Sequence, residues 1–81
     1  MSAIEVLARH LSSQDVEVLE YGSQGHNHYI KVRFARTVDK VMTIIDLARK
    51  LGLRFNDVFV NSSEDETVAS FTFVEAVSWR E

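Results

Sequence analysis

Two histidines, His26 and His28, lie two residues apart and are the side chains in this chain best suited to chemistry. In an extended segment they point the same way, so both imidazoles could face one metal ion or one substrate. A metal ion needs a third or fourth ligand, and no recognisable zinc spacing exists. The other donors on offer are His10, Asp15, Glu17 and Glu20. We therefore predict no metal and no cofactor, and a metal-binding protein that uses His26 and His28 is an alternative.

Glu75 is the carboxylate that most resembles a catalytic group, because it follows Phe71 and Phe73 at the same parity of a predicted strand. We interpret it as the point where this strand has left the core. The chain has no cysteine, which excludes disulfides, thiol nucleophiles and zinc sites built on cysteine. It also has no serine elbow and no phosphate-binding glycine loop. We predict no catalytic residue, and a small enzyme that uses the two histidines is an alternative.

A third candidate is the alternating segment that carries Tyr29, Lys31 and Arg33 on one side. Ferredoxin-like RNA-binding modules stack bases on aromatic side chains of an exposed sheet. Only one aromatic residue is placed here, the RNP consensus is absent, and the net charge is -3. We expect nucleic acid not to be the partner, and an RNA-binding module is retained as an alternative.

Length and composition predict one small globular domain that spans residues 1–81. Hydrophobic residues make up 46% of the chain and charged residues 26%, which excludes a disordered or coiled-coil protein. No apolar run approaches the roughly 18 residues that a membrane span needs. We expect a cytoplasmic protein if the chain is complete, and a periplasmic one only if it is a fragment of a membrane-anchored protein.

The first half of the sequence predicts a helix followed by two strands. Ser2 and Glu5 have the spacing of a capping box, and an apolar stripe follows at helical spacing over Ile4, Leu7, Ala8 and Leu11. The next segments are a strand over 16–21, a loop over 22–27 that is longer than the tightest turn, and a strand over 28–36. In the first strand we place Val16 and Val18 on one side, and Glu17, Leu19 and Tyr21 on the other.

The second half predicts a helix and two more strands. Thr37 can cap a helix that runs to Leu51, and Gly52 is its natural stop. We place the buried stripe of this helix on Val38, Val41, Met42, Ile45 and Ala48, widened by Ile44, Leu47 and Leu51. Strands follow over 53–60 and 68–77, joined by an acidic turn over 61–66. We expect Trp79, near the C-terminus, to close the core.

The resulting order is α-β-β-α-β-β, an α+β fold with a four-stranded antiparallel sheet and two helices on one face. Moving the last strand to the front gives the ferredoxin-like order, so this is a circularly permuted ferredoxin-like fold. The second and fourth strands are then central, and the first and third are edges. Both helices cover the face that holds Ile30, Val32, Phe34, Phe71 and Phe73. The opposite face displays Tyr29, Lys31, Arg33, Ser70, Thr72 and Val74.

This element order resembles the permuted ferredoxin-like domains of bacterial type II secretion inner-membrane proteins and their type IV pilus assembly relatives. The resemblance implies a bacterial, non-catalytic domain that forms homodimers and heterodimers through helix and strand surfaces. The pterin carbinolamine dehydratases share this element order, and the stretch from Phe34 to Leu51 is similar to their central helix. Where those enzymes have paired histidines followed by proline, this chain has Leu53-Arg54-Phe55. No dehydratase residue can therefore be assigned.

The function that the sequence favours is a protein interaction or assembly module. Its predicted interface is the open sheet face, represented by Tyr29, Lys31, Arg33, Ser70, Thr72 and Val74, together with the two edge strands. The expected partner is another protein or a second copy of the chain, most simply as a homodimer.

Overall fold

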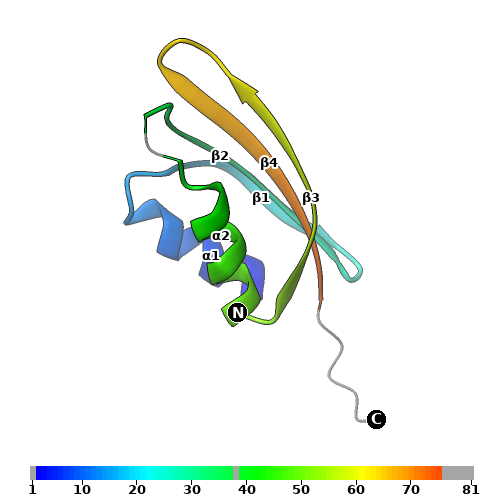
Figure 1. The fold of residues 1–81 in the computed structure, drawn as a ribbon. Helices are drawn as coiled ribbons and strands as arrows, with labels where there is room; N and C mark the ends of the chain where they lie inside the picture. Colours follow the sequence, from blue (N-terminus) through cyan, green and yellow to red (C-terminus); the bar gives the residue numbers. More distant parts are fainter. Residues whose placement is uncertain (1, 38, 76–81) are drawn as a thin grey trace.

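The structure is a computed structural model that describes residues 2–37 and 39–75. Its elements are α1 (Ala3–Ser12), β1 (Glu17–Gln24), β2 (Asn27–Ala35), α2 (Val41–Lys50), β3 (Leu53–Ser62) and β4 (Glu66–Glu75). The strands form one antiparallel sheet in the order β1-β2-β4-β3, and both helices lie on the same face of it (Figure 1). The predicted α+β class, element order and central pair of strands are confirmed, and the topology is compatible with a ferredoxin-like fold.

The start of α1 follows the predicted capping box. The Glu5 backbone N–H donates to the Ser2 hydroxyl at 3.4 Å, and the Ser2 backbone N–H donates to the Glu5 carboxylate at 3.1 Å. The hydrogen bond from the Ser2 backbone lowers the pKa of Glu5 below its usual value. The side chains that α1 buries are those of the predicted stripe, namely Ile4, Leu7, Ala8 and Leu11.

The helix α2 starts later than predicted, and one residue of its predicted stripe, Met42, is exposed instead of buried. It begins at Val41 without a side-chain cap from Lys40, so the expected cap at Thr37 is wrong. Ile44 and Ala48, one turn apart, are completely buried, whereas Met42 is 63% exposed. Successive residues of an α-helix are rotated by about 100°, so Met42, two residues before Ile44, lies on the far side of the helix from it. Val38, with which the predicted stripe began, lies outside the described residues.

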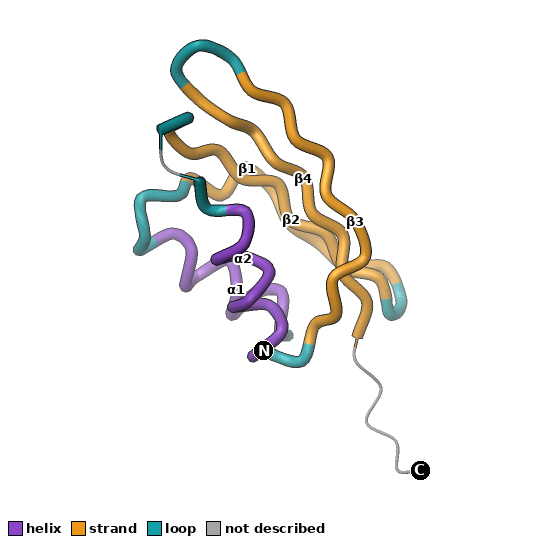
Figure 2. Tube along the Cα trace, viewed as in Figure 1, coloured by secondary structure: helices purple, strands orange, loops and turns teal. Residues whose placement is uncertain are grey.

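The core lies between the helices and the two central strands, as Figure 2 shows for the two layers. Every residue of the predicted core face is at most 5% exposed: Ile30, Val32, Phe34, Phe71 and Phe73. The rings of Phe71 and Phe73 lie parallel, with centroids 5.9 Å apart. The alternation of β2 and β4 was therefore a sufficient guide to the buried side of the sheet.

A β-bulge in β1 changes the side on which its second half points. Val18 pairs with Val32, but the next pair joins Glu20 to Lys31, so Leu19 is an extra residue. Tyr21 pairs with Ile30 and thus shares the helix-covered side of the sheet. The prediction that Tyr21 lies on the same side as Glu17 is wrong, because simple alternation does not survive a bulge.

The two hairpins are tighter than the sequence suggested. Strand β1 continues to Gln24, which pairs with Asn27, so the first hairpin has only Gly25 and His26 in its turn. Gly25 has a φ of +64°, as a type II′ turn requires of its first central residue. The second hairpin pairs Ser62 with Thr67, which leaves a shorter turn than the predicted 61–66. The expected strand end at Val77 and the placement of Trp79 lie outside the described residues.

None of the helices among the described residues is long and apolar enough to cross a membrane.

Candidate functional site

The open face of the sheet brings the predicted interface residues together. Tyr29 pairs with Thr72, and Lys31 pairs with Ser70, across the two central strands. Val74 and Arg33 extend the same face toward its two ends, since they share the parity of these pairs. The six predicted residues therefore lie on one surface, on the side of the sheet that carries neither helix.

Tyr29 is not a free stacking platform. It is 42% exposed, and its ring lies over the backbone of Gly22 on the neighbouring strand. A Cβ atom at Gly22 would come within 2.8 Å of the Tyr29 ring. The glycine thus provides the space that the hydroxyl end of the Tyr29 side chain occupies.

Arg33 is paired with carboxylates. Its guanidinium donates to Glu17 across β1, with Nε 3.1 Å from Oε1, and its Nε lies 3.8 Å from Glu66 Oε1. The hydrogen bond to Glu17, followed by the charges of Glu17 and Glu66, raises the pKa of Arg33. The two neighbouring carboxylates offset the positive charge with which Arg33 would attract a phosphate backbone.

The most exposed large hydrophobic side chain of the described residues is Phe59 on the edge strand β3, at 75%. Phe59 pairs with Ser70 and therefore lies on the open face. A bulge at Asn56 shifts the register, so Phe55, which pairs with Phe73, lies on the helix-covered side instead. The sequence did not predict the position of Phe59, because simple alternation along the strand puts Phe55 and Phe59 on the same side. The signal that could have found it is that this strand has apolar residues on both sides.

The edge of β3 is long and regular from Asp57 to Ser62. Over this segment the pairing with β4 has no bulge, and Val60 adds a second exposed side chain at 46%. The backbone N–H of Val58 donates to the Asp57 carboxylate at 2.9 Å, as expected for an N–H on the free side of an edge strand. The other edge, β1, carries Glu17 and Glu20 around its bulge. Charges and bulges are the usual devices that prevent an edge from pairing, so β3 is the less protected edge.

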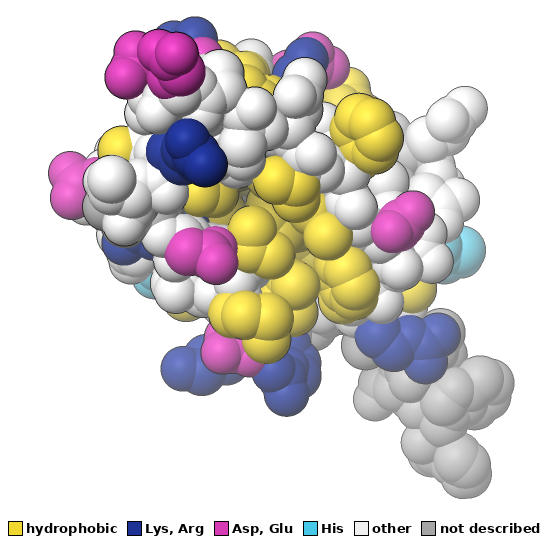
Figure 3. All heavy atoms as spheres, turned by 45° about the horizontal axis from the view of Figure 1, so that its top comes forward, with side chains coloured by type: hydrophobic (Ala, Val, Ile, Leu, Met, Phe, Trp, Pro, Cys, Tyr) yellow, Lys and Arg dark blue, Asp and Glu magenta, His cyan; other side chains and the backbone are white. Residues whose placement is uncertain are grey.

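Figure 3 shows a second apolar region, where hydrophobic side chains gather in a hollow at the centre of the view and charged groups surround it. The exposed fractions identify further large apolar residues on the surface besides Phe59, namely Leu19, Tyr21, Tyr29, Met42, Phe55 and Val60. On β3 itself, Phe59 lies on the open face, and Phe55 and Val60 lie on the helix-covered side.

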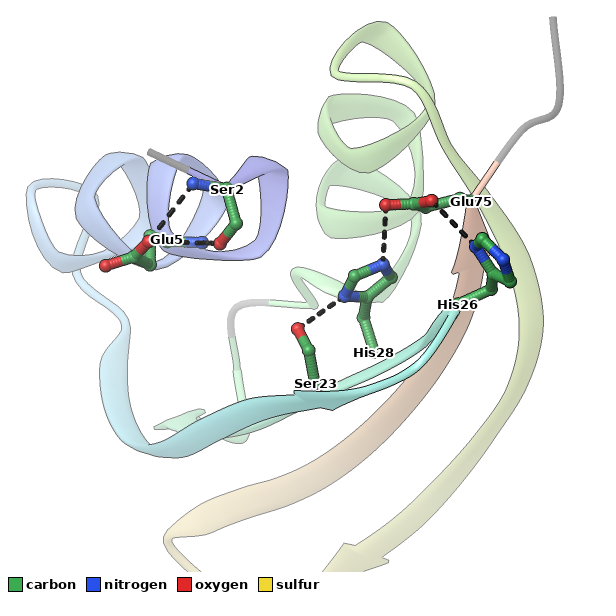
Figure 4. A network of polar contacts seen from close by, with 6 residues as sticks. All are labelled: Ser2, Glu5, Ser23, His26, His28 and Glu75. Carbon is green, nitrogen blue, oxygen red and sulfur yellow. Dashed lines mark hydrogen bonds and ion pairs between the residues drawn. The ribbon is translucent and has the colours of Figure 1, made fainter.

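The histidines meet Glu75 at the opposite end of the sheet from the β3–β4 turn. The Glu75 carboxylate lies between the two rings, with Oε1 3.0 Å from His26 Nδ1 and Oε2 3.5 Å from His28 Nε2 (Figure 4). His28 is 5% exposed, and its Nδ1 lies 2.5 Å from Ser23 Oγ. Its Nε2 has no hydrogen-bond partner among the described residues, since 3.5 Å is too long for a good hydrogen bond.

Glu75 is the last residue of β4 and is exposed, in agreement with the interpretation that the strand has left the core at this point. Its backbone N–H donates to the His26 carbonyl at 3.0 Å, which brings the end of β4 beside the first hairpin. None of the donors proposed from the sequence is the neighbour of the histidines. The sequence could not reveal this pairing, because 49 residues separate His26 from Glu75.

The histidine cluster places two imidazoles around one carboxylate. The two imidazoles approach different oxygens of the Glu75 carboxylate (Figure 4). Among residues 2–37 and 39–75, no three His, Cys, Asp or Glu side chains are placed to hold a metal ion. A cavity of about 190 Å³ touches His28, below the roughly 300 Å³ at which ligand pockets begin.

The hydrogen bond with His26 lowers the pKa of Glu75, and the nearby charges of His26 and His28 act in the same direction. A carboxyl whose pKa is lowered on folding stabilises the protein at pH values above its pKa in the unfolded chain. This stabilisation is lost as the pH falls through its pKa in the folded protein. We expect the melting temperature of the native chain to exceed that of Glu75→Gln above about pH 5, and the difference to shrink toward pH 3.

Thermal unfolding monitored by circular dichroism between these pH values measures this effect. Glu20→Gln is the matched control, because Glu20 is an exposed glutamate with no ion pair to another described residue. A difference for Glu75→Gln that stays constant with pH, or that equals the one for Glu20→Gln, would show that the contacts with the histidines contribute nothing.

No protein-family model, curated protein or solved structure matches this chain.

Proposed function

We propose that this protein is a non-catalytic protein interaction module whose interface is the β3 edge together with the adjoining open sheet face. The observation that carries the proposal is Phe59, which projects from the edge strand into solvent with 75% of its surface exposed. Burying a phenylalanine side chain is worth about 1.5–3 kcal/mol, so leaving one exposed forgoes a large contribution to folding. A partner that covers Phe59 recovers it.

The surroundings of Phe59 support an interface. Aromatic residues at the centre of a contact with polar neighbours are the usual energetic centre of protein interfaces. Here Phe59 has Ser70 beside it, and Lys31 follows on the next strand. The unpaired backbone groups of β3 offer a second kind of contact, the addition of a strand.

The two alternatives have weaker support. For RNA binding, the hydroxyl end of Tyr29 packs against Gly22 and Arg33 is paired with carboxylates. For an enzyme or a metal-binding protein, the two histidines face separate oxygens of Glu75 and adjoin only a small cavity. An interaction module requires none of these features.

The element order is the one that suggested the assembly domains of bacterial type II secretion and type IV pilus systems. Those domains form dimers through helix and strand surfaces, which is the kind of contact that the β3 edge offers. A role as an assembly domain, with a protein partner or a second copy of the chain, is therefore part of the proposal.

Photo-crosslinking in the native cells tests the proposal. We expect benzoyl-phenylalanine at position 59 of the full chain to give crosslinked products, because this side chain contacts the partner directly. The same group at Thr43, which is exposed on α2, is the matched control and should give little product. Equal yields at the two positions, or no product at position 59, would contradict an interface at the β3 edge.

A further inference from the structure

We propose that the partner at the β3 edge is a second copy of this chain, paired antiparallel to β3 about a twofold axis at Phe59. This inference rests on the proposed function and names the occupant of its interface. It follows from three properties of the edge, namely the regular run of six residues, the order of side chains along it, and the charges beyond its ends.

The order of side chains selects the register. A twofold axis perpendicular to the sheet keeps opposed residues on the same face, so each residue must meet one of its own parity. With the axis at Phe59, the two Phe59 rings meet on the open face, and Val58 opposes Val60 on the helix-covered side. Asp57 then opposes Asn61, so no like charges are paired. Shifting the axis to Val58 would instead place Asp57 opposite Phe59 and bring the bulge at Asn56 into the pairing.

The charges beyond the paired run are complementary in this register. Arg54 precedes the run on one copy, and the turn with Glu64 and Asp65 follows it on the other. The antiparallel arrangement brings these groups to the same end, and the twofold axis repeats the contact at the other end. Opposite charges at both ends favour this register over its neighbours. A strand of another protein need not carry charges that fit both ends of the run, whereas a second copy of this chain carries them at both ends.

The backbone can supply the hydrogen bonds. If the Val58 N–H faces the free side, as its bond to Asp57 indicates, then alternation also turns the backbone groups of Val60 outward. Val58 of one copy and Val60 of the other would exchange N–H and C=O bonds, and the two Phe59 residues would form the closer, non-hydrogen-bonded pair. The Asp57 carboxylate must release the Val58 N–H on pairing, which predicts a reversible dimer rather than a permanent one.

The product is a continuous eight-stranded sheet in which all four helices lie on one side. The two open faces join across the axis, so that Tyr29, Lys31 and Thr72 of each copy lie on a single extended surface. Self-association therefore packs the two Phe59 rings against each other and joins the rest of the two open faces into one surface.

Single cysteines test the register, because the native chain has none. In the proposed dimer the Cα atoms of two Phe59→Cys residues lie about 4.5–5.5 Å apart, within disulfide range. The Cα atoms of two Asp57→Cys residues are offset along the strands by four residues, about 13 Å, which is too far for a disulfide. We expect Phe59→Cys to form disulfide dimers at least about tenfold faster than Asp57→Cys under mild oxidation. Circular dichroism verifies that each variant is folded.

A mixed pair gives a second, independent readout. Asp57→Cys and Asn61→Cys chains should each form little disulfide alone but should form a disulfide with each other when mixed, since these positions oppose one another. Equal rates for Phe59→Cys and Asp57→Cys, or no disulfide in the mixture, would overturn the register and the homodimer. If position 59 still crosslinks a different protein in cells, the interaction module survives and only the second copy is wrong. If position 59 crosslinks nothing, both proposals fail.

Discussion

Replacing Phe71 by alanine should lower the free energy of unfolding by about 3–5 kcal/mol, the range for deleting a buried phenylalanine ring. Phe71 lies on the central strand β4, is completely buried and stacks on Phe73. An 81-residue domain has a total stability of roughly 4–12 kcal/mol, so this single change removes a large part of it. Urea unfolding followed by fluorescence or circular dichroism measures the effect.

The control is the next residue along the strand. Thr72 is exposed on the open face, so Thr72→Ala should cost at most about 0.5 kcal/mol beyond its hydrogen bond with Asn56. If Phe71→Ala leaves too little folded protein, Phe71→Leu should still be less stable by roughly 1–2 kcal/mol. Similar losses for Phe71→Leu and Thr72→Ala would mean that β4 faces the helices with its other side.

Local pattern was sufficient to predict the layers of this fold. The alternation of β2 and β4 identifies the buried face without any tertiary information, because side chains of a strand point to opposite sides in turn. The capping box at Ser2 and Glu5 gives the start of α1 because both partners lie within one turn. The order of elements then leaves few topologies with short connections, and the observed one is among them.

The bulges could not be predicted, and they determine the surface. Each inserts one residue opposite a partner strand that the sequence does not identify. In β1 the bulge at Leu19 turns Tyr21 to the helix-covered side, and in β3 the bulge at Asn56 places Phe55 and Phe59 on opposite sides. Position along the strand therefore predicts the face correctly only up to the bulge.

The exposure of Met42 on α2 was not predicted, for a related reason. Apolar residues occupy most of its circumference, so the sequence allows more than one stripe. The contact with β3 and the core selects Ile44 and Ala48, and it leaves Met42 exposed. Tertiary packing, not helical periodicity, decides which of several apolar sides is buried.

The two candidate sites differ in how far the sequence reveals them. The open-face residues on β2 and β4 were predicted as a set, since each belongs to an alternating strand. The contact of His26 and His28 with Glu75 was not, because it depends on the pairing of β2 with the end of β4. Predicting that Phe59 is exposed on the open face would have required both the strand order and the position of the bulge.

Amide hydrogen exchange of the native chain at low and high protein concentration tests the central claim, the pairing of two β3 edges. Outward backbone N–H groups of an edge strand exchange readily with solvent, and they become protected when a second strand bonds to them. Because association increases with concentration, protection of β3 must increase as well. Strand β1, the other edge, provides the internal reference.

Phe59→Lys provides the matched variant, because a lysine on an edge strand prevents pairing while an exposed position tolerates the change. We expect the amides of Val58 and Val60 to exchange at least about tenfold more slowly after a thousandfold rise in protein concentration. Exchange of the β1 amides should not change, and Phe59→Lys should show no slowing on β3. Exchange of β3 that is independent of concentration, or protection that increases equally on β1 and β3, would contradict the account.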